Sequence, residues 1–178
     1  IENTTLFFFL NRTCFNGLFR VNKAGKFNVP YGRYERPLIC DETTILADSQ
    51  ILQNVNILTG DFEQTFEYIT GNTFFYFDPP YRPLSHTSCF NDYAKEAFND
   101  TAQIRLKRFC DRLQNAHIPF MLSNSDGLGQ NGTDRFFDDL FEHYEINRVW
   151  ASRNVNANGA KRGKLTEILV RNYYDATR

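Results

Sequence analysis

The sequence lacks several features that mark other classes of protein. Its 178 residues contain no apolar run approaching the ~18 residues that a membrane-spanning helix needs. Its four cysteines form no C-x-x-C pair, and its three histidines lie at no metal-ligand spacing from them. No secretory signal peptide is recognisable. We therefore expect a cytoplasmic protein with reduced, buried thiols, no metal site and no membrane contact.

What is present is typical of one sizeable globular domain. Hydrophobic residues make up 42% of the chain and aromatic residues 16%. The net charge of −1 conceals an asymmetry, because residues 1–36 carry a net charge of +4 and the remainder −5. The basic residues of this segment are Arg12, Arg20, Lys23, Lys26, Arg33 and Arg36. The segment is the candidate contact for a polyanion.

Residues 74–81 form the most informative stretch. Four uncharged aromatic residues indicate a fully buried strand, which ends at Asp78 and two prolines. Ligands of open α/β sheets bind at this carboxyl edge. Asp78 and a proline carbonyl can each accept one hydrogen of an amino group while the Tyr81 ring stacks on a flat heterocycle. The alternative is a proline turn that only closes the strand.

The sequence Asp78-Pro79-Pro80-Tyr81 resembles the catalytic motif of S-adenosylmethionine-dependent amino-methyltransferases that act on DNA. The resemblance implies a catalytic set of these four residues. Asp61 and Phe62 follow an expected strand at 55–59, and the resemblance makes them cofactor contacts together with Asp78. From the residues alone, Asp61 is equally well read as the N-cap of a helix over 62–70.

A hairpin is expected near the N-terminus, with strands at 18–21 and 27–29 around a polar turn at 22–26. A basic two-stranded ribbon fits the major groove of DNA, although a solvated basic hairpin is the alternative. The whole segment resembles the target-recognition part of the deoxyadenosine (Dam-type) methylases. By resemblance, Arg20 reads a guanine, Leu18 and Pro30 touch base edges, Arg12 and Arg33 meet phosphates, and Phe15, Asn16 and Tyr34 complete the DNA-binding set.

The remaining elements are expected from periodicity and flanking residues. Helices are expected at 43–53, from Asp100 with Gln103 completing its cap, and around Phe136–Phe141; strands are expected at 118–122, 145–151 and 165–170. Residues 123–126 then either line the base pocket or form an ordinary turn. The loop at 82–93 is a lid or a plain surface loop, and the loop at 152–164 is a phosphate-contacting strip or a hairpin turn.

This order of elements predicts an α/β fold, a doubly wound and mostly parallel sheet with an antiparallel last strand. The resemblance makes it the S-adenosylmethionine-dependent methyltransferase fold. Residues 1–36 would be the C-terminal part of the target-recognition subdomain, and residues 37–178 the catalytic part. The family's glycine-rich cofactor loop and ribose-binding acid have no counterpart here, so the chain resembles the later two-thirds of such an enzyme. An N-terminal segment, on the same or a second chain, is expected to complete an otherwise monomeric protein.

The function implied by the resemblance is methylation of the 6-amino group of adenine in duplex DNA, with base flipping, at GATC sites. Solitary and restriction-modification enzymes both fit. One alternative is an inactive chain that serves only as a DNA-binding module. A second is cytosine 4-amino methylation, which is disfavoured because that group more often has Ser in place of Asp78.

Overall fold

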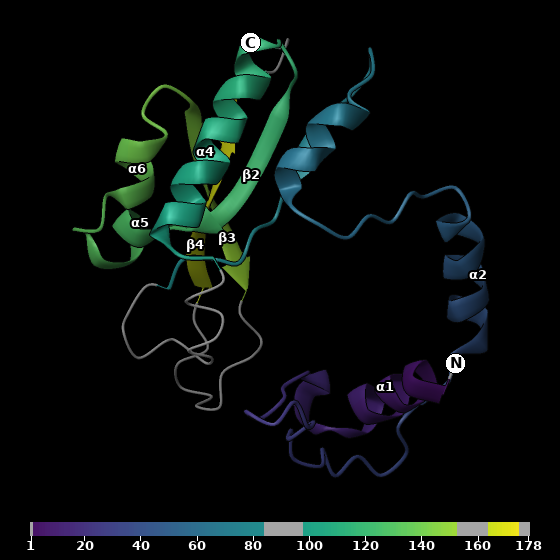
Figure 1. Ribbon diagram of the computed structural model, residues 1–178. Coiled ribbons are helices and arrows are strands. Elements are labelled where there is room, and N and C mark those ends of the chain that lie inside the picture. The colour runs from purple at the N-terminus through teal and green to yellow at the C-terminus, as the bar shows by residue number, and fades with distance from the viewer. Residues whose placement is uncertain (1, 84–97, 153–163, 175–178) are drawn as a thin grey trace. The chain divides into compact units, whose positions relative to one another are not determined.

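The computed structural model describes residues 2–83, 98–152 and 164–174. It divides into two compact units, Ile1–Gly60 and Asp61–Arg178, which are described separately (Figure 1). The functional division at residue 36 remains a prediction. In the part of the chain that is described, no helix is long and apolar enough to cross a membrane.

The first unit contains two α-helices and one short 3-10 helix. They are α1 (Glu2–Thr13), η1 (Phe15–Gly17) and α2 (Glu42–Leu52). Helix α2 begins after Asp41, whose side chain accepts a hydrogen bond from the Thr44 amide, as expected of an N-cap. The helix expected at 43–53 is thus confirmed to within one residue at each end.

The expected hairpin is present as a turn with only one bridge between its arms. Val21 pairs with Phe27 in antiparallel fashion, and the Asn22 amide donates to the Lys26 carbonyl over 2.8 Å. Regular strands are absent from 18–21 and 27–29. An isolated two-stranded hairpin is marginal in water, which explains the short pairing.

The prediction of a strand at residues 55–59 is wrong. These residues form no ladder with the described part of the chain, and Ile57 is 75% exposed. A strand needs a neighbour to satisfy its amides and carbonyls, and none of the described residues supplies one.

The described part of the second unit is built on a mixed four-stranded sheet. Its strands are β1 (Phe75–Phe77), β2 (Phe120–Ser125), β3 (Glu145–Ser152) and β4 (Lys164–Arg171). Their order is β1-β2-β4-β3; β1 and β2 are parallel, and the other two pairs are antiparallel. The antiparallel last strand is as expected. Among the described strands only one pair is parallel, fewer than the sequence led us to expect.

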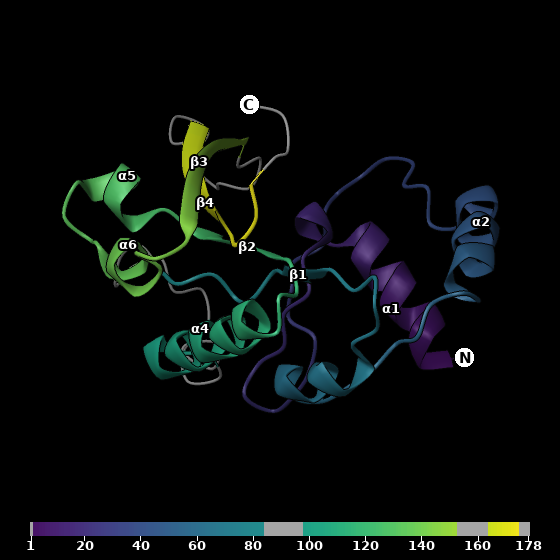
Figure 2. The same cartoon turned by 90° about the horizontal axis from the view of Figure 1, so that it is seen from above.

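Helix α4 (Asp100–Asn115) supplies the largest helical part of the core and packs against the sheet (Figure 2). Its buried apolar stripe is Leu106, Phe109, Cys110 and Leu113, as predicted. The cap is Asn99, one residue before the expected start. Short helices α5 (Gly127–Asn131) and α6 (Phe136–Leu140) follow β2, and Phe137 and Phe141 join the same core.

Two expectations near β1 are corrected by the structure. The strand is not fully buried: it lies at the edge of the described sheet, and Phe74 and Tyr76 are 50% and 58% exposed. The helix expected at 62–70 is instead a 3-10 helix, η2 (Phe62–Tyr68). Residues 84–97 and 153–163 lie outside the described residues, so the lid and the phosphate-contacting strip remain predictions.

Candidate active site

The candidate site is the loop that follows β1, and Ser123 of β2 anchors its first residue. The register places Phe77 opposite Leu122, so Ser123 is next to Asp78. The Ser123 hydroxyl lies 3.0 Å from Asp78 Oδ1 and 3.3 Å from the Phe77 carbonyl oxygen. Ser123 is buried, whereas Asp78 is exposed. Asp78 Oδ2 has no hydrogen-bond partner among the described residues, so it is available to a ligand.

The two prolines of the loop differ in how their carbonyl groups are used. The buried side chain of Gln103 donates from Nε2 to the Pro80 carbonyl over 3.0 Å. No described residue donates to the Pro79 carbonyl. Asp78 Oδ2 and the Pro79 carbonyl are therefore two acceptors that receive no hydrogen bond from the described residues, and a pair of acceptors is what an amino group needs.

Tyr81 is held by its hydroxyl. That group donates to Glu167 Oε2 of β4 over 3.2 Å. Burial raises the pKa of Tyr81, and the negative charges of Glu167 and Asp78 raise it further. The phenol is therefore protonated at neutral pH and serves as a donor that fixes the ring.

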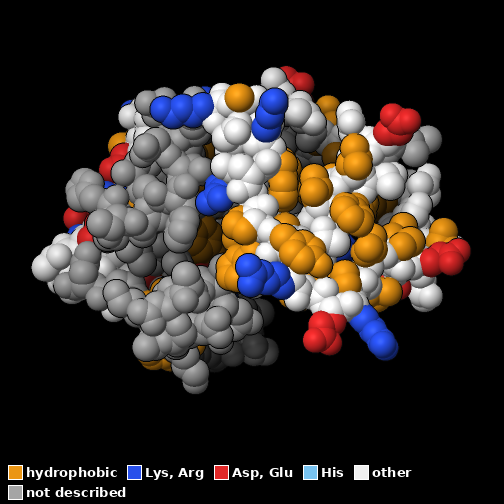
Figure 3. Space-filling model, turned by 90° about the horizontal axis from the view of Figure 1, so that it is seen from below, with side chains coloured by type: hydrophobic (Ala, Val, Ile, Leu, Met, Phe, Trp, Pro, Cys, Tyr) orange, Lys and Arg blue, Asp and Glu red, His pale blue; other side chains and the backbone are white. Residues whose placement is uncertain are grey.

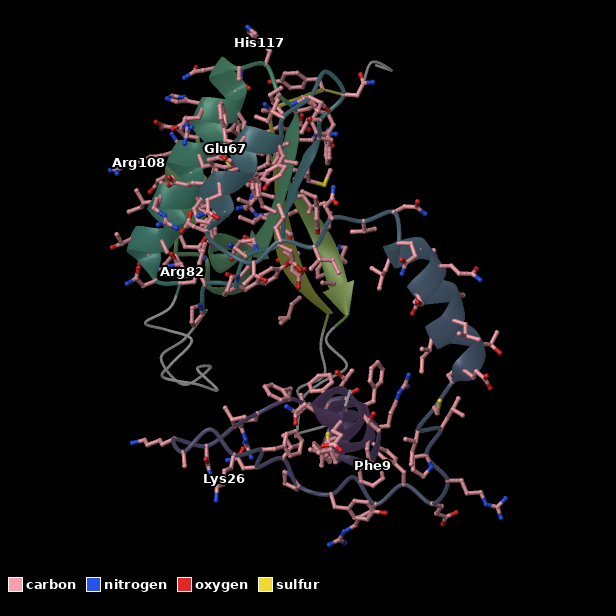
Figure 4. The ribbon with its side chains drawn as sticks, turned by 45° about the vertical axis from the view of Figure 1, so that its right-hand side comes forward. Phe9, Lys26, Glu67, Arg82, Arg108 and His117 are labelled. Atoms are coloured by element: carbon pink, nitrogen blue, oxygen red, sulfur yellow. The ribbon has the colours of Figure 1, made fainter. Side chains whose placement is uncertain are left out.

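Arg82 closes the loop with contacts from both its backbone and its side chain. Its amide donates to Asn124 Oδ1 over 3.0 Å, and its carbonyl accepts from the Ser125 hydroxyl over 2.6 Å. Its guanidinium pairs with Asp100 at 2.8 Å and Asp134 at 2.6 Å, the first of which contributes most to raising the pKa of Arg82. Figure 4 shows Arg82 beside the N-terminal end of α4.

The residues after Ser123 divide between the site and the framework. Asn124 and Ser125 belong to β2 and not to a turn, and both contact the backbone of Arg82. Their place in a base pocket stays a prediction. Asp126 instead caps α5 by accepting from the Gly129 amide, and its fully buried carboxylate pairs with Arg148 at 3.1 Å. Asp126 therefore has a structural role.

Asp61 and Phe62 are both engaged within the second unit. Asp61 is the N-cap of η2, where it accepts from the Glu63 amide at 3.0 Å and pairs with Arg105. The Glu63 hydrogen bond, followed by that from Arg105, lowers the pKa of Asp61. The Phe62 ring packs edge-on against Phe109 at 5.7 Å. The N-cap interpretation is thus correct, and cofactor contact stays a prediction.

The expected DNA-binding residues all lie in the first unit. The Asn16 amide donates to the Tyr34 hydroxyl over 3.0 Å, and the Phe15 amide donates to the Pro30 carbonyl over 2.8 Å. Phe15 and Leu18 are more than 40% exposed. Figure 3 shows hydrophobic side chains gathered on the face that it draws.

The arginines of this set have different surroundings. Asn28 accepts from Arg20 Nε at 2.9 Å and from its Nη2 at 3.0 Å. Arg12 and Tyr34 line one open pocket of about 360 Å³. Arg33 adopts a left-handed backbone conformation with φ 56°.

Comparison with known proteins decides the family. Residues 1–155 match the family described as D12 class N6 adenine-specific DNA methyltransferase. The chain belongs to this family. The resemblance to Dam-type methylases drawn from the sequence is therefore confirmed.

Named relatives agree with this assignment. Type II methyltransferase M.MjaIII of Methanocaldococcus jannaschii is 47% identical over 97% of this chain and 58% of its own length. Type II methyltransferase M1.LlaDCHI of Lactococcus lactis subsp. cremoris is 39% identical over 97% of this chain and 59% of its own. The DNA adenine methylase of Escherichia coli K12 is 31% identical over 95% of this chain and 58% of its own. The chain thus spans less than two-thirds of the length of these relatives.

Sequence reasoning gave no role at the site to several residues that shape it in this D12-class chain. They are Arg82, Gln103, Asp134 and Glu167. Gln103 was expected to close the cap of α4, but it points into the core and contacts Pro80. One signal was available, because Gln103 precedes Leu106 and Cys110 on the apolar stripe by three and seven residues, and a polar residue there needs a buried partner.

Proposed function

We propose that the protein carrying this chain transfers a methyl group from S-adenosylmethionine to the 6-amino group of adenine in duplex DNA. The observation that carries the proposal is the pair of open acceptors, Asp78 Oδ2 and the Pro79 carbonyl, in a chain of the N6 adenine-specific family. Each can accept one hydrogen of the amine.

The chemistry asked of these groups is positioning and electrostatic stabilisation. Two acceptors that bind both amine hydrogens draw the nitrogen lone pair out of conjugation with the ring and aim it at the methyl donor. As the nitrogen–carbon bond forms, the bond from the methyl carbon to sulfur would break and leave a neutral thioether. Asp78 stabilises the positive charge that develops on nitrogen until one amine proton is released to water, and no covalent intermediate with the protein is required. The carboxylate is already held by Ser123, so little reorganisation is needed on binding.

The target base must leave the duplex to reach these acceptors. Flipping a base costs a few kcal/mol, and stacking on an aromatic ring compensates in part. We propose Tyr81 as the stacking partner, because its hydroxyl is tied to Glu167 and its ring is only partly buried.

Asp61, Phe62 and Asp78 are the residues proposed to hold the methyl donor. The chemical types of these residues suit the adenosyl and ammonium groups of the methyl donor. The Asp61 carboxylate, at the N-terminus of η2, can accept a hydrogen bond from an exocyclic amine, and Asp78 offers a second acceptor. S-adenosylmethionine would supply an electrophilic methyl group on a sulfonium. Ring packing and the Arg105 ion pair keep Phe62 and Asp61 in place.

We propose GATC as the recognised sequence. Arg20 is ordered by Asn28 at Nε and Nη2, which leaves Nη1 and one Nη2 hydrogen for a guanine edge. Arg12 and Arg33 would contact phosphates, and Phe15, Asn16, Leu18, Pro30 and Tyr34 would surround the recognised bases.

We also propose that a further segment, on the same or a second chain, pairs with the open edge of β1. The exposed rings of Phe74 and Tyr76 support this, because an aromatic edge strand is an unfavourable surface in water. Such a segment would carry the glycine-rich cofactor loop that this sequence lacks.

The test is methyl transfer to duplexes with and without GATC by the natural full-length protein and by Asp78→Ala. We expect N6-methyladenine from the natural protein, no turnover from Asp78→Ala, and DNA affinity within about twofold in both. Asp139→Ala, which removes an exposed carboxylate that pairs with Arg135 and not with the loop, is the control and should stay active. Turnover by Asp78→Ala, methylated cytosine, or DNA binding without any transfer would each overturn the proposal.

A further inference from the structure

Gln103 stands out because it is a polar residue inside the apolar stripe of α4. Its side chain is 2% exposed and lies on the same face as Leu106 and Cys110. A buried amide is costly unless its hydrogen bonds are made. Packing alone would be served by leucine or methionine at this position, so the hydrogen-bonding partners of Gln103 identify its role.

Those partners form a buried relay between β2 and the loop after β1. Gln103 Nε2 donates to the Pro80 carbonyl over 3.0 Å, and Gln103 Oε1 accepts from Asn124 Nδ2 over 3.3 Å. The carbonyl of Pro80 can only accept, which fixes the orientation of the Gln103 amide. Asn124 is itself fully buried and accepts from the amides of Arg82 and Ser125.

The loop needs such a relay because its sequence removes the usual means of fixing a backbone. Pro79 and Pro80 have no amide hydrogen, so neither can donate to a neighbouring strand or side chain. Between Asp78 and the Tyr81 amide, the backbone can therefore form hydrogen bonds only through its carbonyl groups. The Gln103 side chain donates a hydrogen bond to the Pro80 carbonyl, and the Ser123 hydroxyl donates one to a carboxylate oxygen of Asp78.

We infer that Gln103 is a positioning residue for methyl transfer: by holding the Pro80 carbonyl through the Asn124 relay, it keeps the Pro79 carbonyl open beside Asp78 as the second acceptor for the amine. This inference rests on the proposed function. Gln103 touches neither reacting group, so its effect passes through the loop. Its loss should impair the chemical step more than binding of either substrate.

The test compares Gln103→Met with Gln114→Met in the natural full-length protein. Methionine conserves the volume of Gln103 but removes both hydrogen bonds. Gln114 lies on the same helix and accepts a hydrogen bond from Asn172 at an exposed position away from the loop, so it controls for the loss of a glutamine amide from α4. We expect Gln103→Met to lower kcat roughly 10- to 100-fold while the KM values for DNA and S-adenosylmethionine change less than about threefold. Gln114→Met should leave all three unchanged.

A second readout does not depend on activity. Hydrogen exchange at the amides of Tyr81 and Arg82 should accelerate in Gln103→Met but not in Gln114→Met. If the natural protein shows no methyl transfer, the proposed function fails, and unchanged exchange would separately overturn the role of Gln103. An unchanged kcat, or a loss confined to KM, would also overturn it.

A further variant covers the case in which Gln103→Met does not fold. In Gln103→Leu an apolar side chain removes both hydrogen bonds without burying a charge. The same selective loss of kcat is expected, and full activity of this variant would overturn the inference.

Discussion

The two units place the same type of side chain in opposite environments. Phe7, Phe8 and Phe9 of α1 are 46%, 41% and 47% exposed, whereas Phe109 and Phe120 of the second unit are 1% and 0% exposed. Three consecutive residues of a helix spread over roughly 200° of its surface and cannot all face one neighbour. The stripe of α4 recurs every three or four residues and fits one sheet face. Aromatic content therefore makes a core only where the spacing matches a partner surface.

The units also differ in how their candidate functional groups are held. The loop after β1 is fixed by buried donors and acceptors, namely Ser123, Gln103 and Asn124. The Arg20 side chain is fixed by Asn28 through exposed hydrogen bonds, which contribute less because water competes for them. A buried network favours a rigid chemical site, and an exposed hairpin favours adjustment to a nucleic acid surface.

The largest expected effect tests the contrast between buried and exposed rings. Phe109 contacts the rings of Phe62, Phe66, Phe75 and Phe77. We expect Phe109→Ala to lower the free energy of unfolding by about 3–5 kcal/mol because it leaves a cavity. Phe9→Ala, whose side chain is labelled in Figure 4, should cost below about 0.5 kcal/mol. Urea denaturation measures both, and equal losses would show that another surface covers α1 in the natural protein.

The next effect concerns an ion pair on the second unit. Arg148 pairs with Asp126, whose side chain is 0% exposed, and with Asp138. Arg148→Met should lower the free energy of unfolding by roughly 2–4 kcal/mol, less than for a fully buried pair because Arg148 is itself about one-third exposed. Arg135→Met, which breaks an exposed pair with Asp139, should cost under about 0.5 kcal/mol. Similar losses in the two variants would contradict the burial argument.

A smaller effect separates base reading from phosphate contact in the first unit. Arg20→Ala should reduce discrimination between GATC and altered sites by ~1–3 kcal/mol. Arg33→Ala should instead weaken binding to all sites alike and reduce the salt dependence of the affinity. Binding titrations at several salt concentrations distinguish these outcomes. Equal loss of specificity in both variants would refute the different roles.

The smallest effect is the pH dependence of a helix cap. The hydrogen bond from the Thr44 amide, and then that from its hydroxyl, lowers the pKa of Asp41. Stability from this group is therefore present above its unfolded pKa of ~3.9 and is lost as pH falls through the lower folded value. We expect the helicity of α2, followed by NMR, to decline over that acidic range. Asp41→Asn should remove this dependence, and an unchanged titration in that variant would exclude the cap as its cause.

Prediction from sequence was most accurate where the signal was local and repeated. The stripe of α4 and the strands at 145–151 and 165–170 were recognisable, because alternation and helical spacing report directly on one buried face. The bounds of α2 were also predicted to within one residue at each end. The acid followed by two prolines also located the end of β1 correctly. The failures included the strands expected at 18–21, 27–29 and 55–59, the α-helix expected at 62–70, and the full burial expected of the aromatic strand.

The sequence by itself determined the family, the helical stripe that builds the core and the identity of the Asp78 loop, because each is written in contiguous residues. Only the tertiary structure decided which groups of that loop stay open to a ligand. Gln103, Asn124 and Glu167 come from α4, β2 and β4, and no local pattern shows that they meet Pro80, Arg82 and Tyr81. The partial burial of β1 was likewise decided by its place at the edge of the described sheet. A hydrophobic side chain is buried only where a neighbouring element covers it.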